Sequence, residues 1–179
     1  MIKKNPSSLK IINNSQELFI NGKLIKTPFQ QKIVMNNTIE IYKDFSEYPG
    51  LRYCVLSDNS GEEFYHKILN ERFKESLDKN EKLIVDLDYT GGFASSFLDE
   101  AFGNLVYDFT LDKVLENIEI ISNEEPHWIN VIKDKTFKEW EKRRKENTPP
   151  KKTISHEPWY RLVNNSIEKK IWHGNNELS

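Results

Sequence analysis

The chain has 179 residues, a formal net charge of −2, and 37% hydrophobic against 30% charged residues. This length suits one ordinary domain with extensions, and 12% aromatic residues are enough to build a core, which excludes general disorder. No apolar run is long enough to span a bilayer, and no secretory signal opens the chain. The lone cysteine, Cys54, excludes an internal disulfide and any zinc site built from several cysteines. We therefore expect a cytoplasmic protein of bacterial type.

The N-terminal part predicts two β-hairpins. Apolar triplets at 18–20 and 23–25 flank an Asn-Gly pair, which readily adopts the positive φ angles of a type I′ turn. β-prone runs at 32–35 and 38–42 flank an Asn-Asn turn, and a short strand is expected over 52–56. We interpret the first hairpin as an appendage to the main domain.

A helix is predicted from Ser60 to about Asp78. Ser60 and Glu63 fit a capping box, in which the serine hydroxyl accepts from the Glu63 amide and the Glu63 carboxylate reaches back to the Ser60 amide. The apolar stripe of this helix consists of Phe64, Ile68, Leu69, Phe73 and Leu77.

The segment 83–87 predicts a buried parallel strand, because it is a short apolar run between two helical patterns. After Gly91 and Gly92, an amphipathic helix is predicted from Ser95 onward, followed by a short helix and a strand over 118–121. The residues expected to form one core cluster are Ile84, Leu87, Phe97, Leu98, Ala101 and Phe102.

A further helix is predicted over 126–146, with Pro126 in the first turn, where a missing N–H costs nothing. Residues 133–152 carry nine Lys or Arg and four Asp or Glu, a balance of +5 that leaves −7 for the rest of the chain. A solvated helix face explains such a run, and so does contact with nucleic acid or an acidic protein. The candidate basic contact face of this helix consists of Lys135, Lys138, Lys142 and Lys145.

The segment 148–179 shows no helical or strand periodicity, but it is rich in aromatic residues. Trp159, Tyr160 and Trp172 would leave large apolar surfaces in water if the segment were free. We therefore expect 159–171 to be ordered, packed on its own domain or on another copy of the chain. The alternative is a linear segment that folds only on a partner.

The loop that ends at Ser95 is the most informative candidate site. Helix N-termini offer unpaired N–H groups and a partial positive charge, which favour phosphate, and Ser95 and Ser96 stand at this one. Gly91 and Gly92 shape the loop. The alternative is that one serine is only an N-cap, with Asp99 completing a capping box after Ser96. The loop has neither a Walker A nor a dinucleotide-binding signature.

The remaining candidates are weaker. Asp88 either binds a metal or supports the glycine loop that follows it, and we favour the second role. The histidines lack ligand spacing, and His66 and His127 are expected at the surface. Cys54 is expected to be a small buried hydrophobe, since no base is visible to activate it. The sequence thus predicts no metal site, no cofactor and no enzyme.

Three runs, in this order and at this spacing, resemble the STAS-like domain of unknown function found in many bacteria and phages: SGEEF at 60–64, VDLD at 85–88 and SSFLDEAFG at 95–103. The resemblance covers about residues 39–144. More distantly, the chain is similar to the STAS domain of anti-sigma-factor antagonists, which carry Asp-Ser-Ser-Gly at a helix start. Their second serine is phosphorylated by a partner kinase and matches Ser96. Ala94 and Phe97 replace the flanking aspartate and glycine.

We therefore predict an α/β fold, with a small STAS-like sheet and packed helices. The three parts are an N-terminal β-hairpin extension at 1–30, the STAS-like domain at 31–147 and an aromatic-rich tail at 148–179. The resemblance implies a non-catalytic regulatory or protein-interaction module that acts through the helix start after the glycine loop. It also implies a protein partner, a histidine-kinase-type ATPase in bacterial signalling or phage defence, or self-association. The alternative is a nucleic-acid-binding accessory protein that uses the basic helix face. No contact with a membrane is expected.

Overall fold

The computed structural model describes residues 11–12, 15–20, 23–28 and 37–172, and the chain divides into two units, 1–36 and 37–179. The first unit is an antiparallel sheet of β1 (Ile11–Ile12), β2 (Ser15–Ile20) and β3 (Lys23–Pro28). Strands β2 and β3 pair from Ile20 and Lys23 outward, which confirms the predicted N-terminal hairpin. The strand expected over 32–35 lies outside the described residues.

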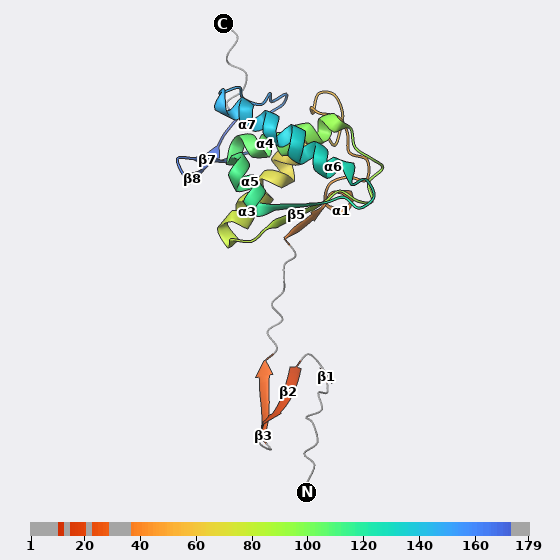
Figure 1. Ribbon diagram of the computed structural model, residues 1–179, viewed down its shortest axis with the longest axis vertical. Coiled ribbons are helices and arrows are strands. Elements are labelled where there is room, and N and C mark those ends of the chain that lie inside the picture. The colour runs from red at the N-terminus through yellow and green to blue at the C-terminus, as the bar shows by residue number, and fades with distance from the viewer. Residues whose placement is uncertain (1–10, 13–14, 21–22, 29–36, 173–179) are drawn as a thin grey trace. The chain divides into compact units, whose positions relative to one another are not determined.

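The second unit is built on a three-stranded parallel sheet in the order β4-β5-β6 (Figure 1). These strands are β4 (Thr38–Glu40), β5 (Leu83–Asp86) and β6 (Ile118–Ile121). The register places Val85 between Ile39 and Ile120. The strands predicted over 83–87 and 118–121 are therefore confirmed, as parallel neighbours.

The strand expected over 38–42 is confirmed only for Thr38–Glu40, where β4 pairs in parallel with β5, and the chain then turns into a short helix, α1 (Ile41–Asp44). The partner expected for it over 32–35 lies outside the described residues. The segment 52–56 forms turns instead of a strand. The strand expected there is therefore wrong. The Leu56 amide donates to the Tyr53 carbonyl at 2.9 Å within the turn, and the Arg52 carbonyl accepts from the Glu62 amide of α2 at 3.0 Å.

Helices fill both crossovers of the sheet. The first crossover is one continuous helix made of α2 (Gly61–Phe64), the π-helical turn η1 (Tyr65–Leu69) and α3 (Asn70–Lys79). The second consists of α4 (Ser95–Phe109) and α5 (Leu111–Asn117). A third continuous helix follows β6, with α6 (His127–Asn130), η2 (Val131–Thr136) and α7 (Phe137–Lys145). The helices predicted from Ser60, from Ser95 and over 126–146 are confirmed, although neither π-helical turn was expected.

One face of the sheet carries the core. Right-handed crossovers between strands in sequential order place the crossover helices on the same face, and Figure 1 shows them on one side of β5. On that face Leu83 and Val85 are fully buried, whereas Ile84 lies on the opposite face and is only half-buried. The placement of Ile84 in the core cluster was therefore wrong. The other five expected members are all buried, namely Leu87, Phe97, Leu98, Ala101 and Phe102.

Helix α4 lies between the sheet and α7. Gly103 allows the close approach of α7, because a Cβ atom at this position would lie 2.1 Å from the indole of Trp140. Trp140 itself is 1% exposed. None of the helices in the described ranges combines the length and the apolar character needed to cross a lipid bilayer.

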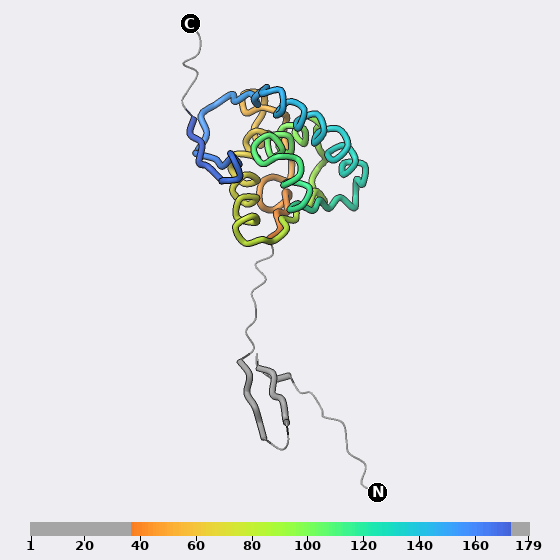
Figure 2. The backbone as a smooth tube through the Cα atoms, turned by 60° about the vertical axis from the view of Figure 1, so that its left-hand side comes forward, coloured from red at the N-terminus to blue at the C-terminus, as the bar shows by residue number. Residues whose placement is uncertain are grey.

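The aromatic-rich tail contains a hairpin of β7 (Trp159–Val163) and β8 (Ser166–Lys170). Its turn residues, Asn164 and Asn165, have φ angles of 51° and 64°, as a type I′ turn requires. Strand β7 packs on α3 and α4, and Figure 2 shows the blue hairpin beside the body of the second unit. The segment 159–171 was expected to be ordered on its own domain or on another copy of the chain, and the first of these is confirmed. The two strands form although the segment shows no strand periodicity.

Candidate functional site

The predicted serine site lies at the first turn of α4. Ser95 and Ser96 are the first two residues of the helix and follow the N-cap Ala94, which makes no side-chain capping bond. The N-cap interpretation of the serines was therefore wrong. The box with Asp99 does not form either, because the Asp99 carboxylate accepts from Arg52 Nη1 at 2.5 Å and from Trp140 Nε1 at 3.2 Å.

The glycine loop joins β5 to this turn. Gly92 has a φ of +112°, which favours glycine. The Gly91 amide donates to the Glu47 carbonyl at 2.8 Å, and a Cβ atom on Gly91 would lie 2.7 Å from the Tyr48 ring. Gly91 thus brings the 45–59 loop against the loop that precedes α4.

Asp88 supports a different loop from the one expected. It is 6% exposed, and its carboxylate accepts from the Asn123 amide and Asn123 Nδ2, each at 2.7 Å, and from the Glu124 amide at 2.9 Å. These donors belong to the loop after β6. Asp88 therefore joins the carboxyl ends of β5 and β6, and its role as support for the Gly91-Gly92 loop was wrong.

Exposed apolar side chains gather on the two loops beside the start of α4. Arg52 holds the first of these loops against the helix, since its guanidinium bonds both Asp99 and Glu100. Among the described residues, nine large apolar side chains are exposed, and five of them lie on these loops. We name this group the α4-start surface, and its members are Tyr48, Leu51, Val55, Leu56 and Tyr89.

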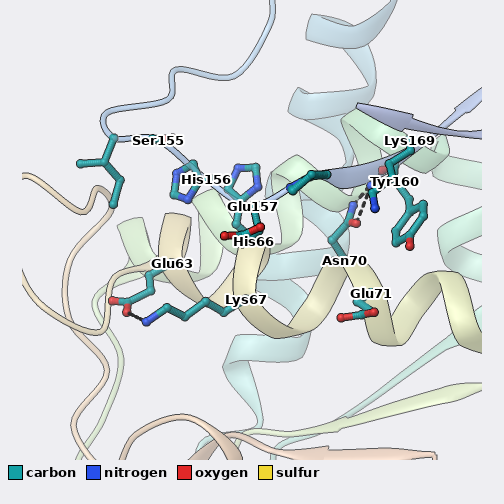
Figure 3. A pocket seen from close by; sticks show the side chains of 12 residues that line it. Glu63, His66, Lys67, Asn70, Glu71, Ser155, His156, Glu157, Tyr160 and Lys169 are labelled. Carbon is teal, nitrogen blue, oxygen red and sulfur yellow. Dashed lines mark hydrogen bonds and ion pairs between the residues drawn. The ribbon is translucent and has the colours of Figure 1, made fainter. Parts of the chain in front are cut away.

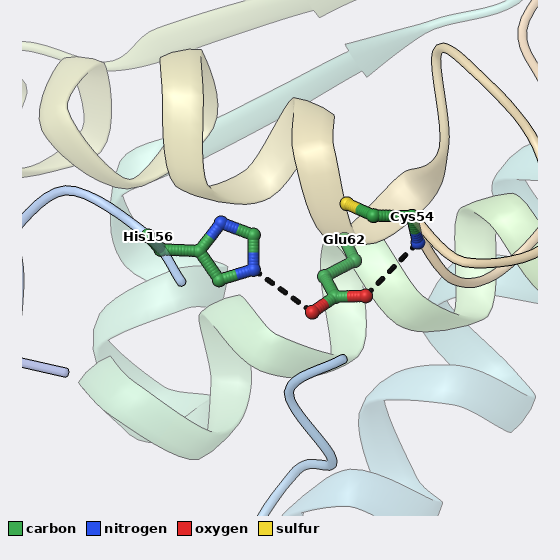
Figure 4. A group of neighbouring side chains, drawn as sticks. All are labelled: Cys54, Glu62 and His156. Carbon is green, nitrogen blue, oxygen red and sulfur yellow. Dashed lines mark hydrogen bonds and ion pairs between the residues drawn. The ribbon is translucent and has the colours of Figure 1, made fainter. Parts of the chain in front are cut away.

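A second cluster is centred on Glu62, in the first turn of α2 (Figure 4). Glu62 is 1% exposed, and its carboxylate accepts from the Cys54 amide at 3.0 Å and from His156 Nε2 at 2.8 Å. The Thr153 amide and hydroxyl also donate to it, each at 2.6 Å. Burial raises the pKa of Glu62, but these hydrogen bonds outweigh it and hold the pKa at about 2. Glu62 is therefore a buried, ionised carboxylate at neutral pH.

His66 lies beside this cluster. Its ring stacks on that of His156, with centroids 3.9 Å apart and an angle of 10° between the planes. His66 is 8% exposed, so its expected surface position was wrong, whereas His127 is exposed as expected. Burial, His156 and Lys152 lower the pKa of His66 to about 2, which keeps the ring neutral. The buried His66 Nδ1 bonds to no described residue.

A cavity of about 520 Å³ opens next to the stacked histidines (Figure 3). It lies between the helix of the first crossover and the segment that leads into β7. Its lining is mostly polar and charged, with both signs present: Glu63, His66, Lys67, Asn70, Glu71, Ile154, Ser155, His156, Glu157, Pro158, Tyr160 and Lys169. Such a lining suits a polar ligand rather than an apolar one.

Cys54 is half-buried, and its Sγ lies 3.3 Å from Ser60 Oγ. Burial raises the pKa of the Cys54 thiol to about 11, and the nearby carboxylates of Glu62 and Glu63 act in the same direction. The free thiol is therefore protonated at neutral pH and is a poor nucleophile. Ser60 also caps α2, since its hydroxyl accepts from the Glu63 amide at 3.1 Å, which confirms that half of the predicted capping box.

The four lysines of the candidate basic face, Lys135, Lys138, Lys142 and Lys145, are all exposed. Lys138 pairs with Asp134 at 3.0 Å, and Lys145 pairs with Glu141 at 3.4 Å. These acidic neighbours on the same helix reduce the positive field of the face.

The parallel sheet, the helices on one of its faces and the helix that begins after the glycine loop define an α/β domain. Residues 60–128 match the family model of a STAS-like domain of unknown function (DUF4325), and the resemblance is thereby confirmed. The match runs from the N-cap of α2 into α6, a narrower range than 39–144. No curated protein and no solved structure matches the chain.

Proposed function

We propose that the protein is a non-catalytic regulatory module that binds another protein through the α4-start surface. The observation that carries this proposal is the concentration of exposed apolar side chains on the two loops beside the first turn of α4. Tyr48 and Tyr89 are each 69% exposed. Exposed apolar groups that cluster on one surface are typical of protein interaction sites, and aromatic residues are enriched in the centres of such interfaces.

Ser96 supplies the regulatory element of this proposal. It lies in the first turn of a 15-residue helix, where a phosphate would meet unpaired backbone N–H groups and the positive end of the helix dipole. The guanidinium of Arg52 is held beside α4 by its ion pair with Asp99. The resemblance to anti-sigma-factor antagonists favours a histidine-kinase-type ATPase as the partner that acts on this turn.

A site-specific crosslinking experiment tests the surface. A photoreactive amino acid replaces Tyr89 in one variant and Leu115, which is 46% exposed on α5, in a matched control. In cells that express the protein from its native context, we expect one discrete crosslinked protein from position 89 and none from position 115. Equal or absent crosslinking at both positions would contradict the proposal.

The basic face of the continuous helix formed by η2 and α7 supports a second candidate function, binding to nucleic acid. Lys135 and Lys142 are exposed and have no acidic partner among the described residues. Fluorescence anisotropy with labelled duplex DNA and RNA tests this function, since phosphate contacts give affinity that falls steeply with salt. Binding that is unchanged in the variant Lys135→Glu, Lys142→Glu would contradict it.

A further inference from the structure

Three different metal-binding side chains converge beside α2. Cys54 comes from the loop before the helix, Glu62 from its first turn, and His156 from the segment before β7 (Figure 4). Their ligand atoms, the Cys54 Sγ, a Glu62 carboxylate oxygen and a His156 ring nitrogen, all lie within 4.8 Å of one another. Within the described ranges, this is the one group of three such residues with that proximity.

We propose that Cys54, Glu62 and His156 form a binding site for a thiophilic divalent cation, with Zn²⁺ as the representative ion. Thiolate and imidazole ligands favour Zn²⁺ over Mg²⁺ and Ca²⁺, which prefer oxygen ligands alone. Three protein ligands leave a fourth tetrahedral position for water or for a group from a partner.

The separations are compatible with this coordination after small side-chain movements. In a tetrahedral site with Zn–S near 2.3 Å and Zn–N or Zn–O near 2.0 Å, the ligand atoms lie about 3.3 to 3.5 Å apart. The present distance from His156 Nε2 to Glu62 Oε1 is 2.8 Å, so these two atoms separate slightly when the cation enters between them. Cys54 Sγ, which lies within 4.8 Å of the other two ligand atoms, moves toward them by at most about 1.3 Å.

The polar surroundings prepare the site for a cation. Glu62 is buried and ionised, and both of its oxygens are oriented by Thr153, which donates from its amide and its hydroxyl. The ring of His156 is held in place by its stack on His66. Ligands that are oriented by such neighbours bind metal more tightly than free ones.

Binding redistributes two protons. The Cys54 thiol loses its proton to solvent and becomes a thiolate ligand. The proton that His156 Nε2 donates to Glu62 moves to Nδ1 of the same ring, which frees the Nε2 lone pair for the cation. The site therefore takes up a divalent cation and releases one proton.

A bound cation would crosslink two segments of the chain that lie far apart in sequence. His156 is 94 residues from Glu62, and it belongs to the segment that leads into β7. A bound ion would replace one hydrogen bond between these parts with two coordination bonds, and it would link both to the loop that carries Cys54. We therefore expect the ion to stabilise the packing of the tail against α2.

Metal binding by the full, tag-free chain is the test. After removal of metals with a chelator, Zn²⁺ is titrated against a chromophoric competitor, and Co²⁺ is used as a spectroscopic probe. We expect one Zn²⁺ per chain and, with Co²⁺, a near-ultraviolet charge-transfer band that reports a thiolate–metal bond. In Cys54→Ser the band should vanish and the affinity fall roughly 100-fold or more, because losing even a group that only orients a ligand costs about 10- to 100-fold.

Two further variants separate the site from adventitious binding. His156→Gln should weaken Zn²⁺ binding as Cys54→Ser does, whereas His127→Gln, which changes an exposed histidine elsewhere, should leave it unchanged. The wild-type Co²⁺ spectrum needs no variant and stays informative if a substitution impairs folding. A wild-type chain that binds no Zn²⁺ stoichiometrically, or a Co²⁺ complex without the thiolate band, would overturn the proposal.

Discussion

The side chain of Asn70 pairs with the backbone of Tyr160 as a neighbouring strand would. The Tyr160 amide donates to Asn70 Oδ1 at 2.7 Å, and Asn70 Nδ2 donates to the Tyr160 carbonyl at 2.8 Å. Asn70 is 1% exposed, so both bonds form away from water. The pairing joins the helix of the first crossover to β7 and makes the tail part of the domain.

Asn70→Ala should loosen the tail. The substitution leaves the backbone N–H and C=O of Tyr160 without these partners, at a cost of about 1–3 kcal/mol in the free energy of unfolding. Limited trypsin digestion should then cleave faster after Lys151 and Lys152, and denaturant titration should show the loss of stability. Cleavage at the wild-type rate would show that the pairing does not hold the tail.

Phe102→Ala and Ile84→Ala compare the core that α4 forms over one face of the sheet with the opposite face of the sheet. Phe102 is fully buried, and its truncation should cost about 3–5 kcal/mol, comparable with the stability of a marginal domain. Ile84 lies on the opposite, half-buried face, so Ile84→Ala should cost clearly less. Urea unfolding of both variants measures the difference, and equal losses would contradict the assignment of faces.

Gly103→Ala should destabilise the domain although alanine favours helices. The gain in helix propensity is about 0.5–1 kcal/mol, whereas overpacking a core costs about 1–3 kcal/mol. The added Cβ would lie 2.1 Å from the Trp140 ring, so the clash should dominate. A second change, Trp140→Phe, should recover part of the loss in the double variant, as thermal unfolding can show. Additive losses would argue against a direct clash.

Glu141 should make stability depend on acid pH. Its hydrogen bonds with Arg144, at 2.7 and 2.8 Å, lower the pKa of Glu141 below 4.5 despite partial burial. As the pH falls, Glu141 therefore takes up its proton earlier in the unfolded chain than in the folded one. The stabilisation that ionised Glu141 adds to the free energy of unfolding is complete above about pH 4.5 and is lost as the pH falls through the folded pKa. Glu141→Gln should cost about 1–3 kcal/mol at neutral pH and progressively less as the pH is lowered toward the acid range. A pH-independent difference in urea unfolding would contradict this linkage.

Ser96→Asp tests regulation at the first turn of α4. A carboxylate there imitates part of the charge of a phosphate, and it is favourable at a helix N-terminus. We expect Ser96→Asp to change the yield of the crosslink formed from position 89, while Ser96→Ala retains the wild-type yield. Circular dichroism controls for folding. The same yield from Ser96→Asp and wild type would exclude a role for charge at this position.

Local patterns predicted most of the fold. The apolar run 83–87 and the stripe from Phe97 to Phe102 carry their own periodicity, and the parallel sheet follows from their order. The face of Ile84 was not predicted, because a continuous apolar run does not show which side a second layer will cover. The tail hairpin was missed although Asn164 and Asn165 suit a type I′ turn, since its strands mix charged and apolar residues without alternation.

The two candidate sites differ in how far the sequence could predict them. The start of α4 at Ser95 was predicted because glycine and serine residues mark a loop and a helix start within a few positions. The cluster of Cys54, Glu62 and His156 left no local signal, since its members are separated by 8 and 94 residues and only packing of the tail brings them together. The burial of Glu62 was equally hidden, because its neighbours in sequence form an ordinary capping motif.

The pairing of Asn70 with Tyr160 has a consequence for how the domain forms on the ribosome. The two residues are 90 positions apart, and at about 5–20 residues per second their synthesis is separated by about 5 to 20 s. During that interval the helix of the first crossover has emerged, but the carboxylate of Glu62 lacks Thr153 and His156, and Asn70 lacks Tyr160. The bonds that Thr153, His156 and Tyr160 make to the first crossover therefore form last. The domain reaches its native state only after the tail has left the exit tunnel.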